Sequence, residues 1–247
     1  MNMTKRTLVI SDIHGCYDAF NRLLEQAVYD PADDLLLLLG DFVDKGPDSS
    51  LVVEQVLGLV RDHGAIAIRG NHDERFVHVA RGGNGEAEGK FFKHGGFETF
   101  TSYVGRPALK GITPENLFTE FRESANGIYA HHIEFLEQLP YYYEDDWYIY
   151  VHAGVNPRFA LNWKQQPKRD FLYIKEPFHS ADRFLSKVVV FGHTKTVDLH
   201  GKPDVWFGKG KIGIDGGCSA GFQLNALEIV GPDLLRTFKV PALGRIK

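Results

Sequence analysis

The first 80 residues alternate between short apolar runs and longer segments in which apolar side chains recur at helical spacing. Apolar runs bounded by glycine and polar residues are typical of strands, and the longer periodicity is typical of amphipathic helices. Strands that alternate with helices indicate βαβ units and a largely parallel sheet, buried on both faces. The expected strands are Thr7–Ser11, Leu35–Leu39 and Ala65–Ile68, and the expected helices are Tyr17–Tyr29, Ser49–Arg61 and Asp73–Ala80.

This alternation stops after Ala80. We interpret residues 81–146, with predicted helices at Thr113–Arg122 and His132–Leu139, as a helical cap inserted into a single domain that spans residues 1–247. A length of 247 residues is consistent with one α/β domain. The last hundred residues predict further strands at Trp147–His152, Val188–Gly192, Lys211–Ile214, Gln223–Val230 and Leu234–Val240.

Composition excludes several classes of protein. The formal net charge is −4, whereas a dedicated nucleic-acid binder is normally basic, so no stable nucleic-acid complex is expected. No apolar run approaches the ~20 residues of a membrane-spanning helix, and Leu8–Ile10 is too short for a signal-peptide core. We therefore expect a cytoplasmic protein without membrane contact. Its two cysteines, Cys16 and Cys218, fit a reducing compartment, and we expect both to be small buried thiols.

Each predicted strand of the first third runs directly into a cluster of polar residues and glycine. Two later strands end in the same way. Ligand sites of open α/β sheets lie at the carboxyl ends of the strands. We therefore expect these clusters to converge on one crevice. The clusters are Ser11–Gly15, Gly40–Pro47, Gly70–Asp73, His152–Gly154 and Gly192–Thr194.

The side chains in these clusters are carboxylates, an amide and imidazoles, a donor set that suits manganese, iron or zinc better than a thiolate-binding metal. Six ligands are too many for one tetrahedral ion but enough for two ions, with Asp41 bridging them. Asp12 and His14 would complete the first metal ion, and Asn71, His152 and His193 would complete the second. Two divalent ions, two aspartates and a bridging hydroxide leave a charge of about +1, which attracts an anionic phosphate.

Taken singly, the motifs have simpler interpretations. The Asp12–Gly15 segment could be a polar turn, the Gly40–Pro47 segment a glycine–proline turn, and Asn71 the start of a helix. Their common place after five predicted strands favours a dinuclear site.

The ordered series Asp-x-His-Gly, Gly-Asp-x-x-Asp-x-Gly, Gly-Asn-His-Asp, His-Ala-Gly and Gly-His resembles the calcineurin-like metallophosphoesterases. More narrowly, it resembles their bacterial phosphoprotein phosphatase branch, which holds serine/threonine phosphatases and symmetrical diadenosine tetraphosphatases. The segments Phe92–Gly96, with Thr99 and Ser102–Tyr103, and Ile212–Asp215 also resemble this branch. The resemblance implies an α/β fold, a two-sheet β-sandwich built on βαβ units, flanked by helices.

The resemblance also implies roles for individual residues. The six metal ligands coincide with those of the family, His72 coincides with its general acid, and Asp44 with the carboxylate that orients that acid. A histidine beside a carboxylate is expected to keep its proton near neutral pH, as a general acid requires. Two family arginines that clamp phosphate are replaced by Lys45 and Lys175, which keep the charge but lose the bidentate fork. Substrate contacts are expected from Lys45, Lys175 and Asn71.

We predict a phosphoester hydrolase that depends on two divalent metal ions, with manganese preferred and iron or zinc as alternatives. A metal-bridging hydroxide would attack phosphorus while His72 protonates the leaving group. The main prediction for the substrate is a phosphoserine or phosphothreonine protein, and the alternative is a dinucleoside tetraphosphate cleaved symmetrically. A non-catalytic binding module would have lost ligands, and none is lost. The oligomeric state is left open.

The remaining histidines lack this support. His94 lies beside Gly95–Gly96 of the cap motif, so a substrate role is one alternative for it. The others are expected to be surface or satisfied polar residues: His63, His78, His131, His132, His179 and His200.

Overall fold

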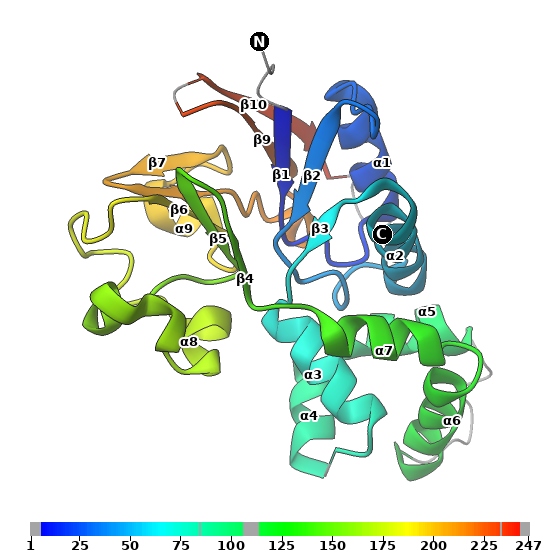
Figure 1. The fold of residues 1–247 in the computed structure, drawn as a ribbon. Coiled ribbons are helices and arrows are strands. Elements are labelled where there is room, and N and C mark those ends of the chain that lie inside the picture. Colours follow the sequence, from blue (N-terminus) through cyan, green and yellow to red (C-terminus); the bar gives the residue numbers. More distant parts are fainter. Residues whose placement is uncertain (1–5, 84, 106–113, 233, 243–247) are drawn as a thin grey trace.

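The computed structural model describes residues 6–83, 85–105, 114–232 and 234–242, which form two five-stranded sheets (Figure 1). The first sheet has the order β10-β9-β1-β2-β3, and the second has the order β4-β5-β6-β8-β7. The strands are β1 (Arg6–Ile10), β2 (Asp34–Leu38), β3 (Ile66–Ala67), β4 (Tyr142–Glu144), β5 (Tyr148–Val151), β6 (Val188–Phe191), β7 (Trp206–Gly208), β8 (Lys211–Gly213), β9 (Gln223–Val230) and β10 (Leu234–Pro241).

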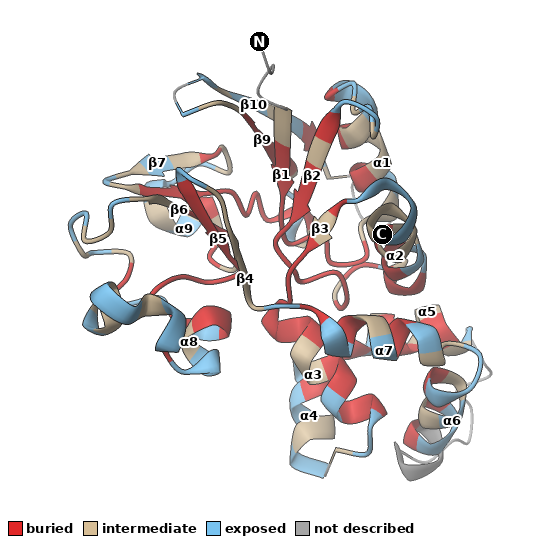
Figure 2. Cartoon of the chain, in the orientation of Figure 1, coloured by how far each residue is buried: buried red, intermediate tan, exposed pale blue. Residues whose placement is uncertain are grey.

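The two sheets pack face to face because their strands alternate between two apolar layers. Val9 points into the layer between the sheets, together with Leu37, Tyr150 and Val190. Its neighbours Leu8 and Ile10 point to the opposite face, where helices cover the first sheet. Successive side chains of a strand point to opposite faces, so an uninterrupted apolar run can fill both layers. Figure 2 shows the lower parts of β1 and β2 buried, as are the loops that follow them.

Helices cover the outer faces and form a separate group below the sheets in Figure 1. Among the described residues, α1, α2, α3, α6 and α7 overlap the predicted helical segments, and α4, α5, α8 and α9 were not predicted. The helices are α1 (Tyr17–Gln26), α2 (Ser49–His63), α3 (Asn71–Ala80), α4 (Gly85–Lys93), α5 (Gly96–Val104), α6 (Pro114–Asn126), α7 (Ala130–Gln138), α8 (Lys168–Tyr173) and α9 (Thr196–His200), with 3-10 helices at Pro157–Gln165 and Cys218–Ala220.

Helices α4–α7, called the cap helices below, lie within the segment predicted as a cap. An aromatic cluster joins them to α3, since the rings of Phe76 and Phe121 are 5.6 Å apart and those of Phe100 and Phe121 are 5.7 Å apart. Strand β4 lies in the same segment but pairs with β5 of the second sheet. The predicted start of a helix at Thr113 lies outside the described residues. The division into one domain with a cap at 81–146 stays a prediction.

The fold class is that predicted, with mixed rather than purely parallel sheets. Strands β1, β2 and β3 are parallel to one another, as are β5, β6 and β8. The antiparallel pairs are β1 with β9, β9 with β10, β4 with β5, and β7 with β8. None of the helices in the described part of the chain is long and apolar enough to cross a membrane.

Candidate active site

Strand register brings the predicted polar clusters together. Ile10 pairs with Leu38 and Leu38 with Ala67, so the loops after β1, β2 and β3 begin at the same level of the first sheet. In the second sheet, Val151 pairs with Phe191, which places His152 and His193 side by side. The two sheet edges meet because the backbone N–H of His193 donates to Asp12 Oδ2 at 2.9 Å.

Asp41 lies between two groups of metal-donor atoms. Its Oδ2 is 3.4 Å from Nε2 of His14, and its Oδ1 is 3.4 Å from Nε2 of His152. Asp12 Oδ1 joins the first group, 3.9 Å from His14 Nε2. The amide oxygen of Asn71 joins the second, 2.9 Å from His152 Nε2 and 2.8 Å from His193 Nδ1. The structure therefore brings all six predicted ligands together around one shared carboxylate.

The second nitrogen of two histidines is held by the backbone. Nδ1 of His14 lies 2.7 Å from the carbonyl of Val43, and Nδ1 of His152 lies 2.8 Å from that of Leu39. These bonds fix the rings with Nε2 toward Asp41, which is the usual arrangement of an imidazole that binds metal. Burial lowers the pKa of His14 well below its ordinary value, and that of His193 likewise. Both rings are thus neutral, the form that binds a cation.

The buried carboxylates have raised pKa values, in contrast to the lowered pKa values of His14 and His193. Burial raises the pKa of Asp12 to about 6, and it also raises the pKa of Asp41. Burial alone would lower the pKa of His152, but Asp41 and Asp12 outweigh it and raise that pKa. Negative charge crowded into a buried site is costly without cations. The donor set and its electrostatics therefore fit two divalent metal ions.

The site is assembled from strained loops. Six of its non-glycine residues have φ between +47° and +72°, a left-handed conformation that L residues rarely adopt. Each such residue costs on the order of 1–3 kcal/mol, so the surrounding packing must hold these loops in place. The six residues are Asp12, His14, Asp41, Asp44, Lys45 and His193.

Two neighbours hold the loop of Asp41 in this shape. The carboxylate of Asp73 accepts the backbone N–H groups of Asp41 and Phe42 at 2.8 and 2.9 Å, and that of Gly70 at 2.9 Å. A Cβ atom at Gly70 would lie 2.2 Å from Asp41 Oδ1, so only glycine fits. The positioning role of Asp73 was not predicted.

His72 and Asp44 form a buried pair beside the donor groups. Nδ1 of His72 lies 2.6 Å from Asp44 Oδ2, and the hydroxyl of Thr99 donates to Asp44 Oδ1 at 2.8 Å. The same hydroxyl oxygen accepts the backbone N–H of Asp44 at 2.7 Å, so α5 reaches directly into the site. Burial lowers the pKa of His72 and raises that of Asp44. Burial thus opposes the expectation that Asp44 alone keeps His72 charged at neutral pH.

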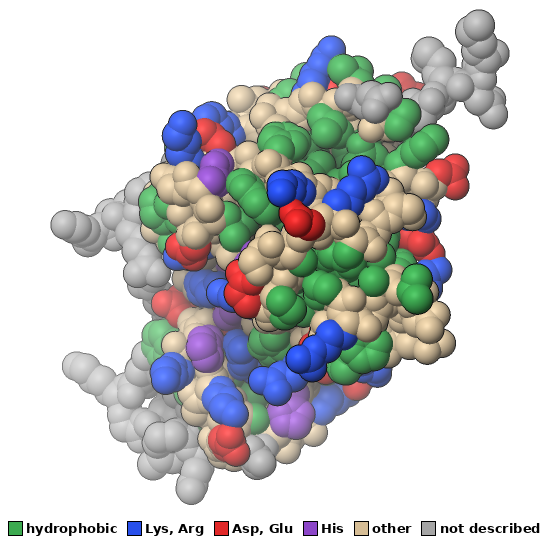
Figure 3. Space-filling model, turned by 90° about the vertical axis from the view of Figure 1, so that its left-hand side faces the viewer, with side chains coloured by type: hydrophobic (Ala, Val, Ile, Leu, Met, Phe, Trp, Pro, Cys, Tyr) green, Lys and Arg blue, Asp and Glu red, His purple; other side chains and the backbone are tan. Residues whose placement is uncertain are grey.

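Cationic side chains face the same centre. Nζ of Lys45 lies 2.7 Å from His14 Nε2, and its backbone N–H donates to the carbonyl of Gly95 at 2.9 Å. Lys175 is exposed after α8, and its charge contributes to the low pKa of His193. The exposed ring of His94 is 6.4 Å from that of His72. Figure 3 shows Lys, Arg and His side chains gathered in the lower part of one face.

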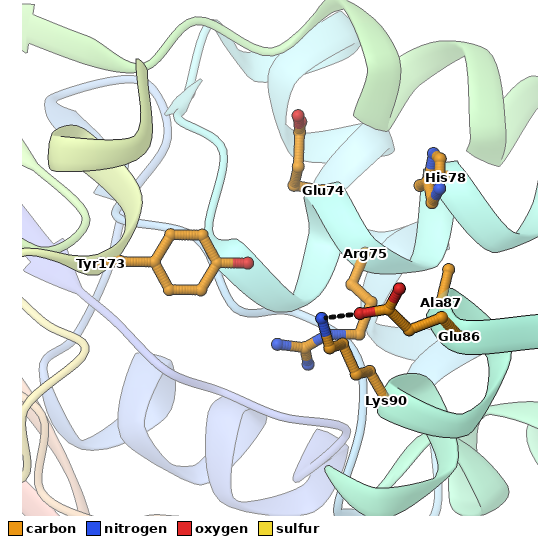
Figure 4. Close-up of a pocket in the computed structure, with 7 residues that line it drawn as sticks. All are labelled: Glu74, Arg75, His78, Glu86, Ala87, Lys90 and Tyr173. Atoms are coloured by element: carbon orange, nitrogen blue, oxygen red, sulfur yellow. Dashed lines mark hydrogen bonds and ion pairs between the residues drawn. The ribbon is translucent and has the colours of Figure 1, made fainter. Parts of the chain in front are cut away.

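Arg75 was missed by the sequence analysis. It lies one helical turn after His72 on α3, with Nη1 3.4 Å from His72 Nδ1 and 4.0 Å from Asp44 Oδ2. The i, i+3 spacing from His72 was the available signal. Arg75 also lines an open groove of about 400 Å³. Figure 4 shows this groove between Tyr173 and the cap helices. The groove is lined by Glu74, Arg75, His78, Glu86, Ala87, Lys90 and Tyr173.

This fold, with His and Asp side chains grouped at its centre that could hold metal, is that of a metallophosphoesterase. Residues 5–212 match the family described as calcineurin-like phosphoesterase, and the chain belongs to that family. The predicted family is therefore confirmed, as is the predicted class of enzyme, a metal-dependent phosphatase.

The curated relatives of this chain are named for different substrates. The chain is 30% identical over 164 residues to a symmetrical bis(5'-nucleosyl)-tetraphosphatase of Dechloromonas aromatica, which covers 66% of this chain and 49% of that protein. It is 27% identical over 256 residues to an asymmetrical bis(5'-nucleosyl)-tetraphosphatase of Anoxybacillus flavithermus, and this alignment covers 95% of this chain and 93% of that protein. A serine/threonine-protein phosphatase 1 of Salmonella typhimurium is 41% identical over 66 residues, covering 27% and 29%. The chain spans about half of the length of the symmetrical enzymes.

Solved structures share the whole architecture. A candidate diadenosine tetraphosphatase superposes with a TM-score of 0.61 at 23% identity, covering 98% of this chain and 96% of that one. A serine/threonine phosphatase of Saccharomyces cerevisiae gives a TM-score of 0.63 at 16% identity, covering 98% and 81%. At such identities the likeness establishes the fold.

Proposed function

We propose that the chain hydrolyses dinucleoside polyphosphates, and that it cleaves diadenosine tetraphosphate symmetrically into two molecules of ADP. The observation that carries the hydrolytic part is the position of Asp41 between the donor atoms of His14 and His72 and those of His152 and His193, with His72 bonded to Asp44. The relatives support the substrate, because a symmetrical tetraphosphatase aligns with 66% of the chain. They favour this alternative over the phosphoprotein substrate that was the main prediction.

In this proposal Asp12, His14 and Asp41 hold one divalent cation, and Asp41, Asn71, His152 and His193 hold the other. Manganese is the preferred ion for this mixed oxygen and nitrogen donor set, with iron and zinc as alternatives. When bound, the two ions supply positive charge for the phosphate and lower the pKa of the attacking water.

His72 is the proposed acid for the leaving oxygen. Its Nδ1 is engaged by Asp44, so Nε2 is the nitrogen that can deliver a proton; this atom lies 4.0 Å from Asp41 Oδ2. As the bond between phosphorus and the bridging oxygen breaks, that proton passes to the departing phosphate. Because His72 must then carry protons on both nitrogens, Asp44 must be ionised. The bond from Thr99 favours that form.

Lys45, Lys175 and Arg75 are the proposed contacts to phosphate oxygens, and the Asn71 amide is a further one. A tetraphosphate is a polyanion, and the two glutamates that line the groove are already paired, Glu86 with Lys90 and Glu74 with Arg69. The groove gives room for the half of the substrate that leaves, with Tyr173 at its edge. This supports a substrate that extends beyond the cleaved bond on that side.

Two other activities remain as candidates, each on a specific observation. A protein phosphatase is supported by 41% identity over 66 residues, and an asymmetrical tetraphosphatase by alignment over 95% of the chain. The three candidates differ in their products, so one panel separates them.

The test uses the manganese-loaded protein with diadenosine tetraphosphate, a phosphoserine peptide and p-nitrophenyl phosphate. Ion-exchange chromatography should detect ADP as the only nucleotide product. Equal amounts of ATP and AMP would replace the symmetrical assignment by the asymmetrical one. A kcat/KM for the peptide far above that for the dinucleotide would overturn the proposed substrate but not the metal site.

A further inference from the structure

A second cluster of metal-donor side chains lies between α2 and α7. It consists of Glu54 on α2 with His131 and His132 in the first turn of α7. Glu54 Oε2 lies 2.7 Å from Nε2 of His132 and 3.2 Å from Nε2 of His131. The two imidazole rings are 4.4 Å apart. None of these residues belongs to the donor groups around Asp41.

We propose that Glu54, His131 and His132 bind a further zinc ion. Two imidazole nitrogens and one carboxylate oxygen are a common zinc donor set, with a fourth position left to water. Zinc bonds of about 2.0–2.2 Å in tetrahedral geometry place neighbouring donor atoms roughly 3.4 Å apart. The donor atoms of this cluster all lie within 4.8 Å of one another, so small side-chain movements would suffice.

The ring of His132 is already held for this role. Its side chain is 1% exposed, and Nδ1 lies 3.0 Å from the hydroxyl of Tyr103 on α5. A partner on the second nitrogen fixes the orientation of a metal-binding histidine, and loss of such a partner typically costs about 10- to 100-fold in affinity. Nε2 is thus the nitrogen left for a cation, and it is the one that faces Glu54.

The cluster is also open to an incoming ion. The side chains of Glu54 and His131 are 58% and 51% exposed, so a hydrated cation can approach from solvent while His132 forms the inner wall. Two neutral imidazoles and one carboxylate leave a zinc site with a net charge of about +1, which needs no further buried counter-charge. Manganese binds such nitrogen-rich sites more weakly than zinc does.

A zinc ion here would connect α2, which packs on the first sheet, to the cap helices. Helix α2 begins next to the loop that carries Asp44, and Ser49 Oγ accepts the N–H of Asp44 at 3.2 Å. Helix α7 packs on α2 and α3. The ion would therefore stabilise the contact between α2 and α7 without taking part in the reaction.

The test counts bound zinc after equilibrium dialysis against a low-micromolar free zinc concentration, by elemental analysis. Glu54→Gln and His131→Ala should each bind one ion per chain fewer than the unmodified protein. Glu134→Gln on α7 and His63→Ala at the end of α2 are matched controls, since both are exposed, and should lose none.

The prediction is that the cluster variants bind one zinc ion per chain fewer than the unmodified protein. The result therefore does not depend on activity or on the number of ions at Asp41. Zinc should also raise the melting temperature of the unmodified protein more than that of His131→Ala. Equal zinc content in the unmodified protein and both cluster variants would overturn the proposal, and so would loss in the controls as well.

Discussion

Nδ1 of His72 lies 2.6 Å from Oδ2 of Asp44, and both side chains are buried. The bond assigns one nitrogen to the carboxylate and the other to the reaction. Burial acts on both members of the pair, because it lowers the pKa of His72 and raises that of Asp44. The pair is thus the first place to test the chemistry.

Replacing His72 by asparagine should keep both metal ions and lower kcat by about 10²–10⁴-fold on an alkyl phosphate. ADP and p-nitrophenolate are both much weaker bases than an alkoxide, so the loss should be smaller on diadenosine tetraphosphate and on p-nitrophenyl phosphate than on the alkyl ester. Steady-state kinetics on the three substrates measures this order. Equal losses on all three would contradict the acid role.

Thr99→Val should lower kcat and move the acidic limb of its pH profile to higher pH. Without the hydroxyl, the ionised form of Asp44 loses a donor and its pKa rises further. The buried Asp44 carboxylate also loses one of its hydrogen bonds, which costs about 1–3 kcal/mol of stability. Thr99→Ser restores the hydroxyl and is the control. A stability loss without movement of the pH profile would show that Thr99 has only a structural role.

Asp41→Asn should reduce the content of both metal ions, because each donor group includes one of its oxygens. Asp12→Asn should affect one ion. Elemental analysis after dialysis against manganese distinguishes the two variants, with the exposed Asp18→Asn as a control. Chelation of the unmodified protein should abolish hydrolysis, and manganese should restore it. Full activity after chelation would refute the metal site.

Without metal, the protein should lose stability more steeply than its Asp215→Asn variant as pH rises from about 4 to 7. This comparison cancels the opposite contribution of the buried histidines, whose pKa values are lowered. Burial raises the pKa of Asp12 to about 6 and that of Asp215 to about 7, so the folded state binds protons more tightly than the unfolded state. Stability falls with pH wherever the folded state holds more protons. Urea unfolding of both chelated proteins at several pH values tests this. Bound manganese should remove or reverse the trend, because cations then compensate the charge.

Lys45→Ala should weaken competitive inhibition by inorganic phosphate and lower kcat/KM, whereas Lys45→Arg should retain much of both. The ammonium group is a point charge close to His14, where it competes with a cation for the Nε2 lone pair. The alanine variant should therefore bind metal at least as well as the original protein. Unchanged phosphate inhibition would remove Lys45 from the binding site.

Arg75→Lys should show whether Arg75 binds phosphate through its guanidinium group or acts only through its positive charge. A lysine keeps the charge but cannot hold two oxygens at fixed geometry. We expect a rise in KM for diadenosine tetraphosphate with little change in metal content. The matched control is Lys90→Gln, which alters the same groove but has its charge already paired with Glu86 at 2.7 Å. A larger effect from Lys90→Gln would place the substrate away from Arg75.

The loops after β1, β2 and β3 were predictable because glycine, aspartate and histidine follow short apolar runs there. Helix α4 was not, since Gly85 and Gly89 lower its intrinsic helical tendency. It forms where Phe91 is buried against Phe76 and Phe121, contacts that no local pattern reveals. Strand β7 has only three residues, too few to show alternation.

The same limit applied within the site. The ligand types could be identified from their motifs, but Asp73 required knowledge of which face of α3 meets the loop of Asp41. The i, i+3 spacing places Arg75 near His72 but does not show that it also approaches Asp44. Lys175 remains a proposed contact, because its position depended on the short stretch Leu172–Lys175 and its side chain is exposed.

The aromatic cluster around Phe76 and Phe121 has a consequence for how such an enzyme can change its substrate. The cap helices share this cluster with α3, whose first residues are Asn71 and His72, and Thr99 of α5 bonds directly to Asp44. Exchanging the cap as a module would therefore disturb the catalytic pair along with the packing. A new substrate specificity is more easily reached by single substitutions on the exposed walls of the groove, where a side chain can change without moving His72 or Asp44.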